Sequence, residues 1–122
     1  FGFSVITNPN ICGHLLGQII KAFGADHMIW GTDCIWFGSP QWQIEAFRRF
    51  QIPEALQEEY GYAAITDAER DLVFGLNVAN LYGVDVSAAR KAASGDVINN
   101  LRAQYREAGA EPSNTSYGWV RG

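Results

Sequence analysis

The chain has 122 residues, a length typical of one domain, and its 48% hydrophobic and 18% charged residues exclude disorder for most of it. Its 9 basic and 13 acidic side chains give a net charge of −4, which argues against a protein that binds the phosphate backbone of nucleic acid. The sequence has no apolar stretch near the roughly 18 residues of a membrane-spanning helix, and its two cysteines form neither a disulfide framework nor a CxxC zinc motif.

The first third of the chain predicts a strand, a helix and a second strand. Phe3–Thr7 is short, aromatic and β-branched, as is typical of a strand. Apolar residues at three- and four-residue spacing predict an amphipathic helix over Ile11–Phe23, ended by Gly24. His27–Trp30 is a short run without alternation, as in a strand covered on both faces. This order predicts a right-handed parallel βαβ unit.

Only helices are predicted after the second strand. They cover Gln41–Phe50, Pro53–Tyr60, Thr66–Tyr82, Ser87–Ala93 and Asp96–Ala108. The third of them opens with a capping box formed by Thr66 and Glu69. Two parallel strands do not make a stable sheet, because both edges stay open. We therefore expect the missing strands to come from absent sequence or from another chain.

The beginning of the sequence indicates a piece of a larger protein. Phe1 is not a methionine, and the residues after it read as the middle of an element. They do not have the charged and apolar regions of a signal peptide, so we expect a cytoplasmic protein. Four Trp, five Tyr and seven Phe imply more apolar area than so short a chain buries by itself, which predicts a homo-oligomer or a larger assembly.

The most informative position is Asp33. It closes the run Trp30-Gly31-Thr32-Asp33, directly after the second predicted strand. In (β/α)₈ barrels the active site lies at the carboxyl ends of the strands, so an acidic residue there is typical of a catalytic group. The alternative is that Asp33 only caps the following loop, and spacing alone leaves both interpretations open.

Two segments resemble one known family. The run GADHMIWGTD, followed later by NVANLYG, resembles the C-terminal end of amidohydrolase-2-type proteins. These are metal-dependent TIM-barrel hydrolases and decarboxylases related to aminocarboxymuconate-semialdehyde decarboxylase. The resemblance implies an α/β fold in which residues 1–83 supply strands 7 and 8 of a TIM (β/α)₈ barrel with their helices. Residues 84–122 would form a helical C-terminal extension and tail.

The resemblance also implies a role for Asp33. In the family the aspartate after barrel strand 8 binds one divalent metal ion, Zn or alternatively Mn, or orients and deprotonates the attacking water beside it. The family's His-x-His motif and its further histidines are absent, because the sequence holds only His14 and His27. Neither histidine follows a predicted strand. The chain alone is therefore not expected to assemble the metal site or to be active.

Four other residues are weaker candidates. Trp36 and Trp42 either wall a substrate pocket or pack in the core or loop, and the sequence does not choose between these. Cys34 follows Asp33 and could face the pocket, but a packed thiol is the simpler interpretation. His14 lies early in an amphipathic helix, where a structural or solvated role is expected.

Two hypotheses follow. In the first, the chain is a fragment of a metal-dependent enzyme that hydrolyses, or decarboxylates, a carboxylated small molecule, with the rest of the barrel supplied by further sequence or another chain. In the second, it is a catalytically silent helical module that associates with itself. Neither hypothesis involves nucleic acid or a membrane.

Overall fold

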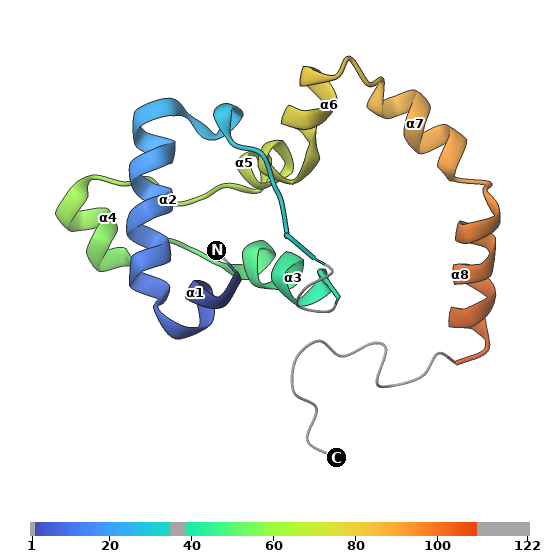
Figure 1. The fold of residues 1–122 in the computed structure, drawn as a ribbon, viewed down its shortest axis with the longest axis horizontal. Helices are drawn as coiled ribbons and strands as arrows, with labels where there is room; N and C mark the ends of the chain where they lie inside the picture. The colour runs from blue at the N-terminus through green and yellow to red at the C-terminus, as the bar shows by residue number, and fades with distance from the viewer. Residues whose placement is uncertain (1, 35–38, 110–122) are drawn as a thin grey trace. The chain divides into compact units, whose positions relative to one another are not determined.

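The computed structural model describes residues 2–34 and 39–109, in which all regular structure is helical (Figure 1). The elements in order are α1 (Gly2–Thr7), α2 (Pro9–Phe23), the 3₁₀ turn η1 (Ala25–His27), α3 (Gln41–Arg49), α4 (Glu54–Tyr60), α5 (Asp67–Asp71), the π turn η2 (Leu72–Leu76), α6 (Asn77–Leu81), α7 (Val86–Ala93) and α8 (Val97–Glu107). Packing divides the chain into two units, with the boundary between Val78 and Ala79.

The strand predicted at Phe3–Thr7 is not confirmed, because these residues belong to helix α1 in the described structure. The helix ends where the Asn8 N–H donates to the Ser4 carbonyl oxygen at 2.8 Å. Aromatic and β-branched residues favour a strand only when a neighbouring strand pairs with them. The described residues contain no such neighbour, and a helix satisfies its own backbone groups without one.

The second predicted strand, His27–Trp30, is also not a strand in the described residues. His27 ends η1, and Met28 has an extended backbone with φ −110° and ψ 139°. This extended backbone pairs with a helix rather than with a strand, because the Trp30 N–H donates to the carbonyl oxygen of Val73. The parallel βαβ unit is therefore not seen among the described residues.

Helix α2 packs closely against the segment that carries α4, and Figure 1 shows the two helices side by side. Gly13 and Gly17 face this segment. A Cβ atom at Gly13 would lie 2.6 Å from Cδ of Pro53, and one at Gly17 would lie 2.4 Å from Cδ2 of Tyr62. Two glycines four residues apart thus let a proline and a tyrosine ring touch the helix backbone.

A buried arginine joins α3 to α5. The Arg70 guanidinium donates to the Phe50 carbonyl oxygen at 2.6 Å and to the Ile65 carbonyl oxygen at 2.8 Å. It also pairs with the exposed Asp67 carboxylate at 3.2 Å. Buried cations are tolerated when several acceptors surround them, so Arg70 has a structural role in the core.

The helices predicted after residue 40 are confirmed to within two residues at their ends. The capping box is also confirmed: Glu69 N–H donates to Thr66 Oγ1, and Thr66 N–H donates to the Glu69 carboxylate. Helix α2 ends at Gly24 as predicted, where φ is +86°. Local spacing and capping chemistry are sufficient to place these helices.

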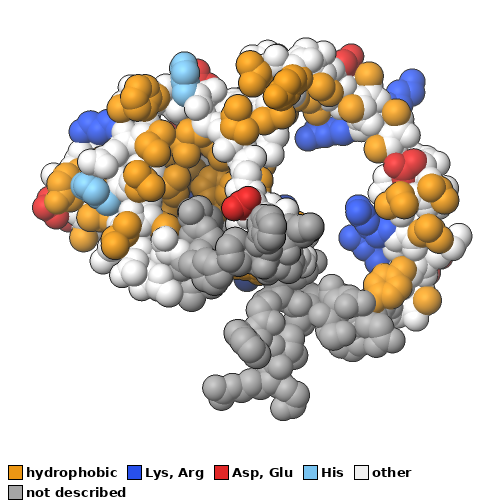
Figure 2. Space-filling view, in the orientation of Figure 1, with side chains coloured by type: hydrophobic (Ala, Val, Ile, Leu, Met, Phe, Trp, Pro, Cys, Tyr) orange, Lys and Arg blue, Asp and Glu red, His pale blue; other side chains and the backbone are white. Residues whose placement is uncertain are grey.

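The second unit contains α7 and α8, and among its described residues no side chain is buried. Asp85 caps α7 through its carboxylate, which accepts the N–H groups of Ser87 and Ala88, and Asp96 caps α8. Several large apolar side chains of α8 are exposed to solvent (Figure 2). They are Val97, Ile98, Leu101 and Tyr105.

Within the described residues no single helix is long and apolar enough to cross a membrane. One bent pair, Asp67–Leu81 with Val86–Ala93, has the necessary length and composition only when its two helices are counted together.

The predicted division of the chain into a barrel part, residues 1–83, and a helical extension, residues 84–122, stays a prediction.

Candidate functional site

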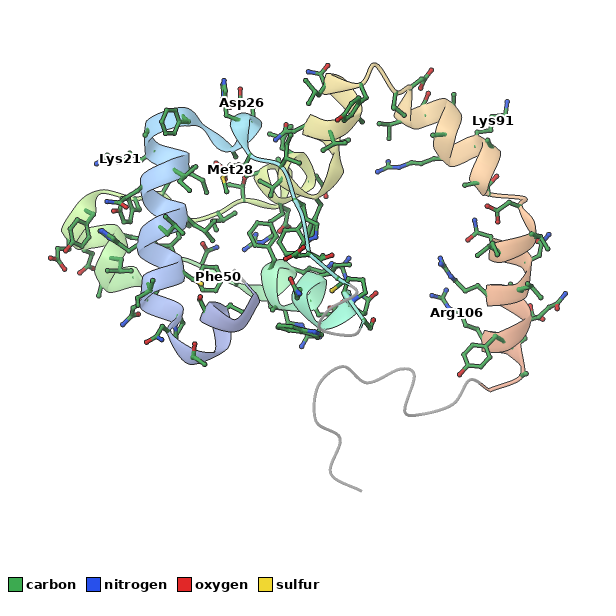
Figure 3. All side chains as sticks on the ribbon, in the orientation of Figure 1. Lys21, Asp26, Met28, Phe50, Lys91 and Arg106 are labelled. Carbon is green, nitrogen blue, oxygen red and sulfur yellow. The ribbon has the colours of Figure 1, made fainter. Side chains whose placement is uncertain are left out.

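The candidate site lies on Met28–Cys34, here named the 28–34 segment, which follows η1 (Figure 3). Its beginning is held by Asn77. The side-chain nitrogen of Asn77 donates to the carbonyl oxygens of Ala25, at 2.8 Å, and Met28, at 2.7 Å. One amide group uses both of its N–H donors to fix the turn from which the segment starts.

The middle of the segment is held by Trp30. Its backbone N–H donates to the Val73 carbonyl oxygen at 3.0 Å. Its indole ring stacks on Phe47, with centroids 5.1 Å apart and planes at 27°, and it meets Phe74 at the same centroid distance. These rings belong to α3 and η2, so both elements hold the segment in place.

The π turn η2 makes this arrangement possible. The Asn77 N–H donates to the Leu72 carbonyl oxygen, five residues back, rather than four residues back as in an α-helix. The Val73 carbonyl oxygen accepts the Trp30 N–H. The turn therefore lets one helix present a backbone carbonyl and the Asn77 side chain to the same segment.

Asp33 has a left-handed backbone, with φ +51°, and is the only non-glycine residue with positive φ in the described part of the chain. Its side chain is exposed. Aspartate tolerates this conformation better than most residues, but the conformation still costs free energy. A strained and exposed carboxylate at the position singled out by the sequence is a reason to propose a function for it.

The turn at Asp33 is held from both sides. The Cys34 N–H donates to Thr32 Oγ1 at 3.3 Å. The side-chain amide of Gln43, a buried residue of α3, lies 3.1 Å from the Thr32 carbonyl oxygen and 3.6 Å from Cys34 Sγ. The sequence did not identify Gln43, because a glutamine on an amphipathic helix carries no signal that distinguishes it from a solvated one.

The other predicted residues lie elsewhere or are packed. Trp42 is half-buried at the start of α3, and Trp36 lies outside the described residues. Cys34 is half-buried and not disulfide-bonded. His14 packs against tyrosines: its Nδ1 lies 3.0 Å from the Tyr62 hydroxyl, and its ring meets Tyr60 edge-on. This contact agrees with the structural role expected for His14.

The described residues of this chain do not form a complete metal site. They contain no group of three or more His, Cys, Asp or Glu side chains placed to hold one ion. His27 is exposed and contacts the Asp26 carboxylate at 3.1 Å, and His14 faces the tyrosines. Asp33 is the one predicted ligand, and a carboxylate fits a single position in a divalent-metal site.

A family model described as Amidohydrolase matches residues 10–84, which is more than half of the chain. The chain belongs to the amidohydrolase family. The matched range contains α2 from its second residue on, the 28–34 segment and the helix that carries Asn77, so the elements that surround Asp33 all lie in the amidohydrolase part of the chain. Comparisons with curated proteins and with solved structures gave no match.

The amidohydrolase family is a family of metal-dependent hydrolases, and membership implies that this chain has its origin in a TIM barrel. The contacts explain how its two resembling runs cooperate. The run GADHMIWGTD contains the 28–34 segment up to Asp33, and NVANLYG begins with Asn77, which binds the start of that segment. Asn77, the first residue of the second run, therefore joins it to the first run within the first unit.

Proposed function

We propose that this chain supplies the C-terminal part, including barrel strands 7 and 8, of a metal-dependent amidohydrolase-type enzyme. The enzyme would hydrolyse a C–N or C–O bond, or remove a carboxylate, in a carboxylated small molecule. The observation that carries this proposal is Asp33: an exposed carboxylate in a strained left-handed conformation, within a segment held by two helices. Non-glycine residues held in sparsely populated backbone conformations cluster at active sites and ligand-binding turns.

Asp33 would act as ligand or proton acceptor. A bound divalent ion, Zn or alternatively Mn, would polarise the substrate and lower the pKa of its water toward neutrality. The Asp33 carboxylate can bind a hard or borderline cation and can accept a proton. Asp33 is exposed and is therefore accessible to a ligand. Trp42, and Trp36 by its position in the sequence, are proposed to wall the substrate pocket.

The remaining ligands would come from further sequence or from another chain. This sequence holds two histidines. His14 contacts the Tyr62 hydroxyl, and His27 contacts the Asp26 carboxylate. The partner of the chain is therefore proposed to be the rest of the barrel, with assembly into a homo-oligomer as the wider expectation.

The test uses the complete polypeptide that carries these residues, loaded with Zn²⁺ or Mn²⁺. Turnover is measured as p-nitrophenyl acetate hydrolysis and as CO₂ release from salicylate, and bound metal is measured by mass spectrometry. Asp33→Asn keeps the shape of the side chain but removes its charge and basicity. We expect turnover to fall about 10²-fold or more, the scale of a lost general base.

Asp26→Asn is the matched control. Asp26 is an exposed carboxylate seven residues earlier, and its side chain contacts the His27 ring. The turnover of Asp26→Asn should stay near that of the wild type. Near-full activity of Asp33→Asn with metal still bound would overturn the assignment of Asp33.

A second candidate function is a catalytically silent, self-associating helical module. The exposed apolar side chains of α8 and of the outer face of α2, such as Ile11 and Leu15, favour it. Light scattering distinguishes the two candidates when combined with the turnover assay: an oligomer without metal-dependent turnover supports the module, and metal-dependent turnover supports the enzyme.

A further inference from the structure

Gln43 is placed to control the geometry of Asp33. It is 5% exposed, and its side-chain amide contacts the residues on both sides of Asp33. The amide nitrogen lies 3.1 Å from the Thr32 carbonyl oxygen and 3.6 Å from Cys34 Sγ. An amide group has two N–H donors, so it can serve both acceptors at once.

These contacts act on the backbone turn rather than on the carboxylate. The Cys34 N–H donates to Thr32 Oγ1, which closes a short turn around Asp33. A left-handed residue in such a turn relaxes toward ordinary φ values unless the flanking residues are held. Gln43 holds both flanking residues from α3, and α3 is in turn packed on Trp30 through Phe47.

We propose that Gln43 is a positioning residue that fixes the left-handed turn of Asp33 and so aims its carboxylate at the reacting site. This inference rests on the proposed function of Asp33. Gln43 itself touches neither metal nor substrate in this role. Residues that orient a ligand from behind typically change metal affinity or activity about 10- to 100-fold when they are replaced.

The experiment uses Gln43→Met in the complete polypeptide, because methionine has similar length and volume but no N–H donor. Gln43→Glu is the second variant: it keeps the shape, and as a carboxylate it cannot donate. We expect kcat to fall at least about 10-fold with KM near the wild-type value, while the melting temperature falls no further in Gln43→Met than in a variant that loses comparable side-chain bonds to the backbone elsewhere. Gln51→Met is the matched control, since Gln51 also bridges backbone groups, those of Ile52 and Ile65, away from Asp33.

A second readout does not depend on activity. The rates at which N-ethylmaleimide alkylates Cys34 and Cys12 are measured by peptide mass spectrometry. Loss of the Gln43 donor should free the turn and increase the Cys34 rate. The Cys12 rate should not change, because Cys12 is 4% exposed in the core and reports only global opening.

The outcomes separate this inference from the proposed function. If Asp33→Asn retains activity while Gln43→Met still speeds Cys34 alkylation, the proposed function fails and the control of the turn by Gln43 stands. If Gln43→Met and Gln43→Glu change neither Cys34 alkylation nor kcat, the positioning role is overturned. A fall in kcat accompanied by a melting temperature below that of Gln51→Met and by faster Cys12 alkylation would also overturn it, because Gln43 would then be a purely structural residue.

Discussion

The side-chain nitrogen of Asn77 lies 2.7 Å from the carbonyl oxygen of Met28, so a helix after residue 66 directly holds the segment that leads to Asp33. The same side-chain amide also donates to the carbonyl oxygen of Ala25. Replacing Asn77 by leucine removes both donors and leaves two carbonyl groups without them. We expect the free energy of unfolding, measured by urea titration of the complete polypeptide, to fall by about 1–3 kcal/mol.

Asn80→Leu is the control for that prediction, because Asn80 is exposed on the same helical run. Its effect should stay within about 0.5 kcal/mol. Equal effects of the two substitutions would show that the contacts of Asn77 contribute nothing specific.

Asp33→Gly should separate stability from activity. Glycine adopts positive φ without the steric cost that Asp33 pays at +51°. We therefore expect the free energy of unfolding to stay the same or to rise by up to about 1 kcal/mol, while the proposed activity is lost. Asp26→Gly, at a position without positive φ, should instead lower stability by about 0.5–1 kcal/mol. A clear destabilisation by Asp33→Gly would mean that the side chain, rather than the backbone, determines this turn.

Gly17→Ala tests the close approach of α2 to Tyr62. The added methyl group would lie 2.4 Å from the tyrosine ring, so helix and ring must separate. We expect a loss of about 1–3 kcal/mol in the free energy of unfolding. Gly75→Ala is the matched control in another helical turn, where no atom lies within 4 Å of the new methyl group, and it should raise stability by up to about 1 kcal/mol. The same sign for both substitutions would contradict this packing.

Asp85 makes the capping of α7 depend on pH. Hydrogen bonds from the Ala88 backbone and from Ser87 hold the pKa of the Asp85 carboxyl below its ordinary value. A lowered folded-state pKa means that the cap contributes stability above the unfolded-state pKa of about 3.9 and loses it as the pH falls through the folded value. The measurement is made in an Asp96→Asn background, where the α8 cap does not titrate, so the Asn99 amide serves as the reference. As the pH falls below about 4, amide hydrogen exchange at Ser87 and Ala88 should accelerate relative to exchange at Asn99. In Asp85→Asn, which caps without titrating, this additional acceleration should disappear.

The helices could be predicted from the sequence because their signals are local. The spacing of apolar residues, the capping box of Thr66 and Glu69, and the glycine after α2 each act within a few residues. The strands could not be predicted in this way. Whether Phe3–Thr7 is a strand depends on a pairing partner, and in the described residues this stretch instead completes helix α1.

The same distinction applies to the site. Asp33 could be singled out because it follows Trp30-Gly31-Thr32, and its exposure and strained backbone agree with a functional role that stays a prediction. Gln43 could not, since its role depends on α3 lying against Thr32 and Cys34. The double contact of Asn77 likewise depends on a π turn, for which the sequence LVFGL has no established signal.

The π turn also determines which changes of length this region tolerates. A π turn holds one residue more than the α-helical turn it replaces, so deleting Gly75 would allow regular helical hydrogen bonding through this stretch. The Asn77 N–H could then keep its bond to the Leu72 carbonyl oxygen as an ordinary α-helical bond, so the residues after the deletion would keep nearly the same angular position. Asn77 would therefore stay near the carbonyl oxygens of Ala25 and Met28. A deletion in a regular turn of the same helix would instead rotate Asn77 by about 100°, the angle of one helical residue, and break both contacts.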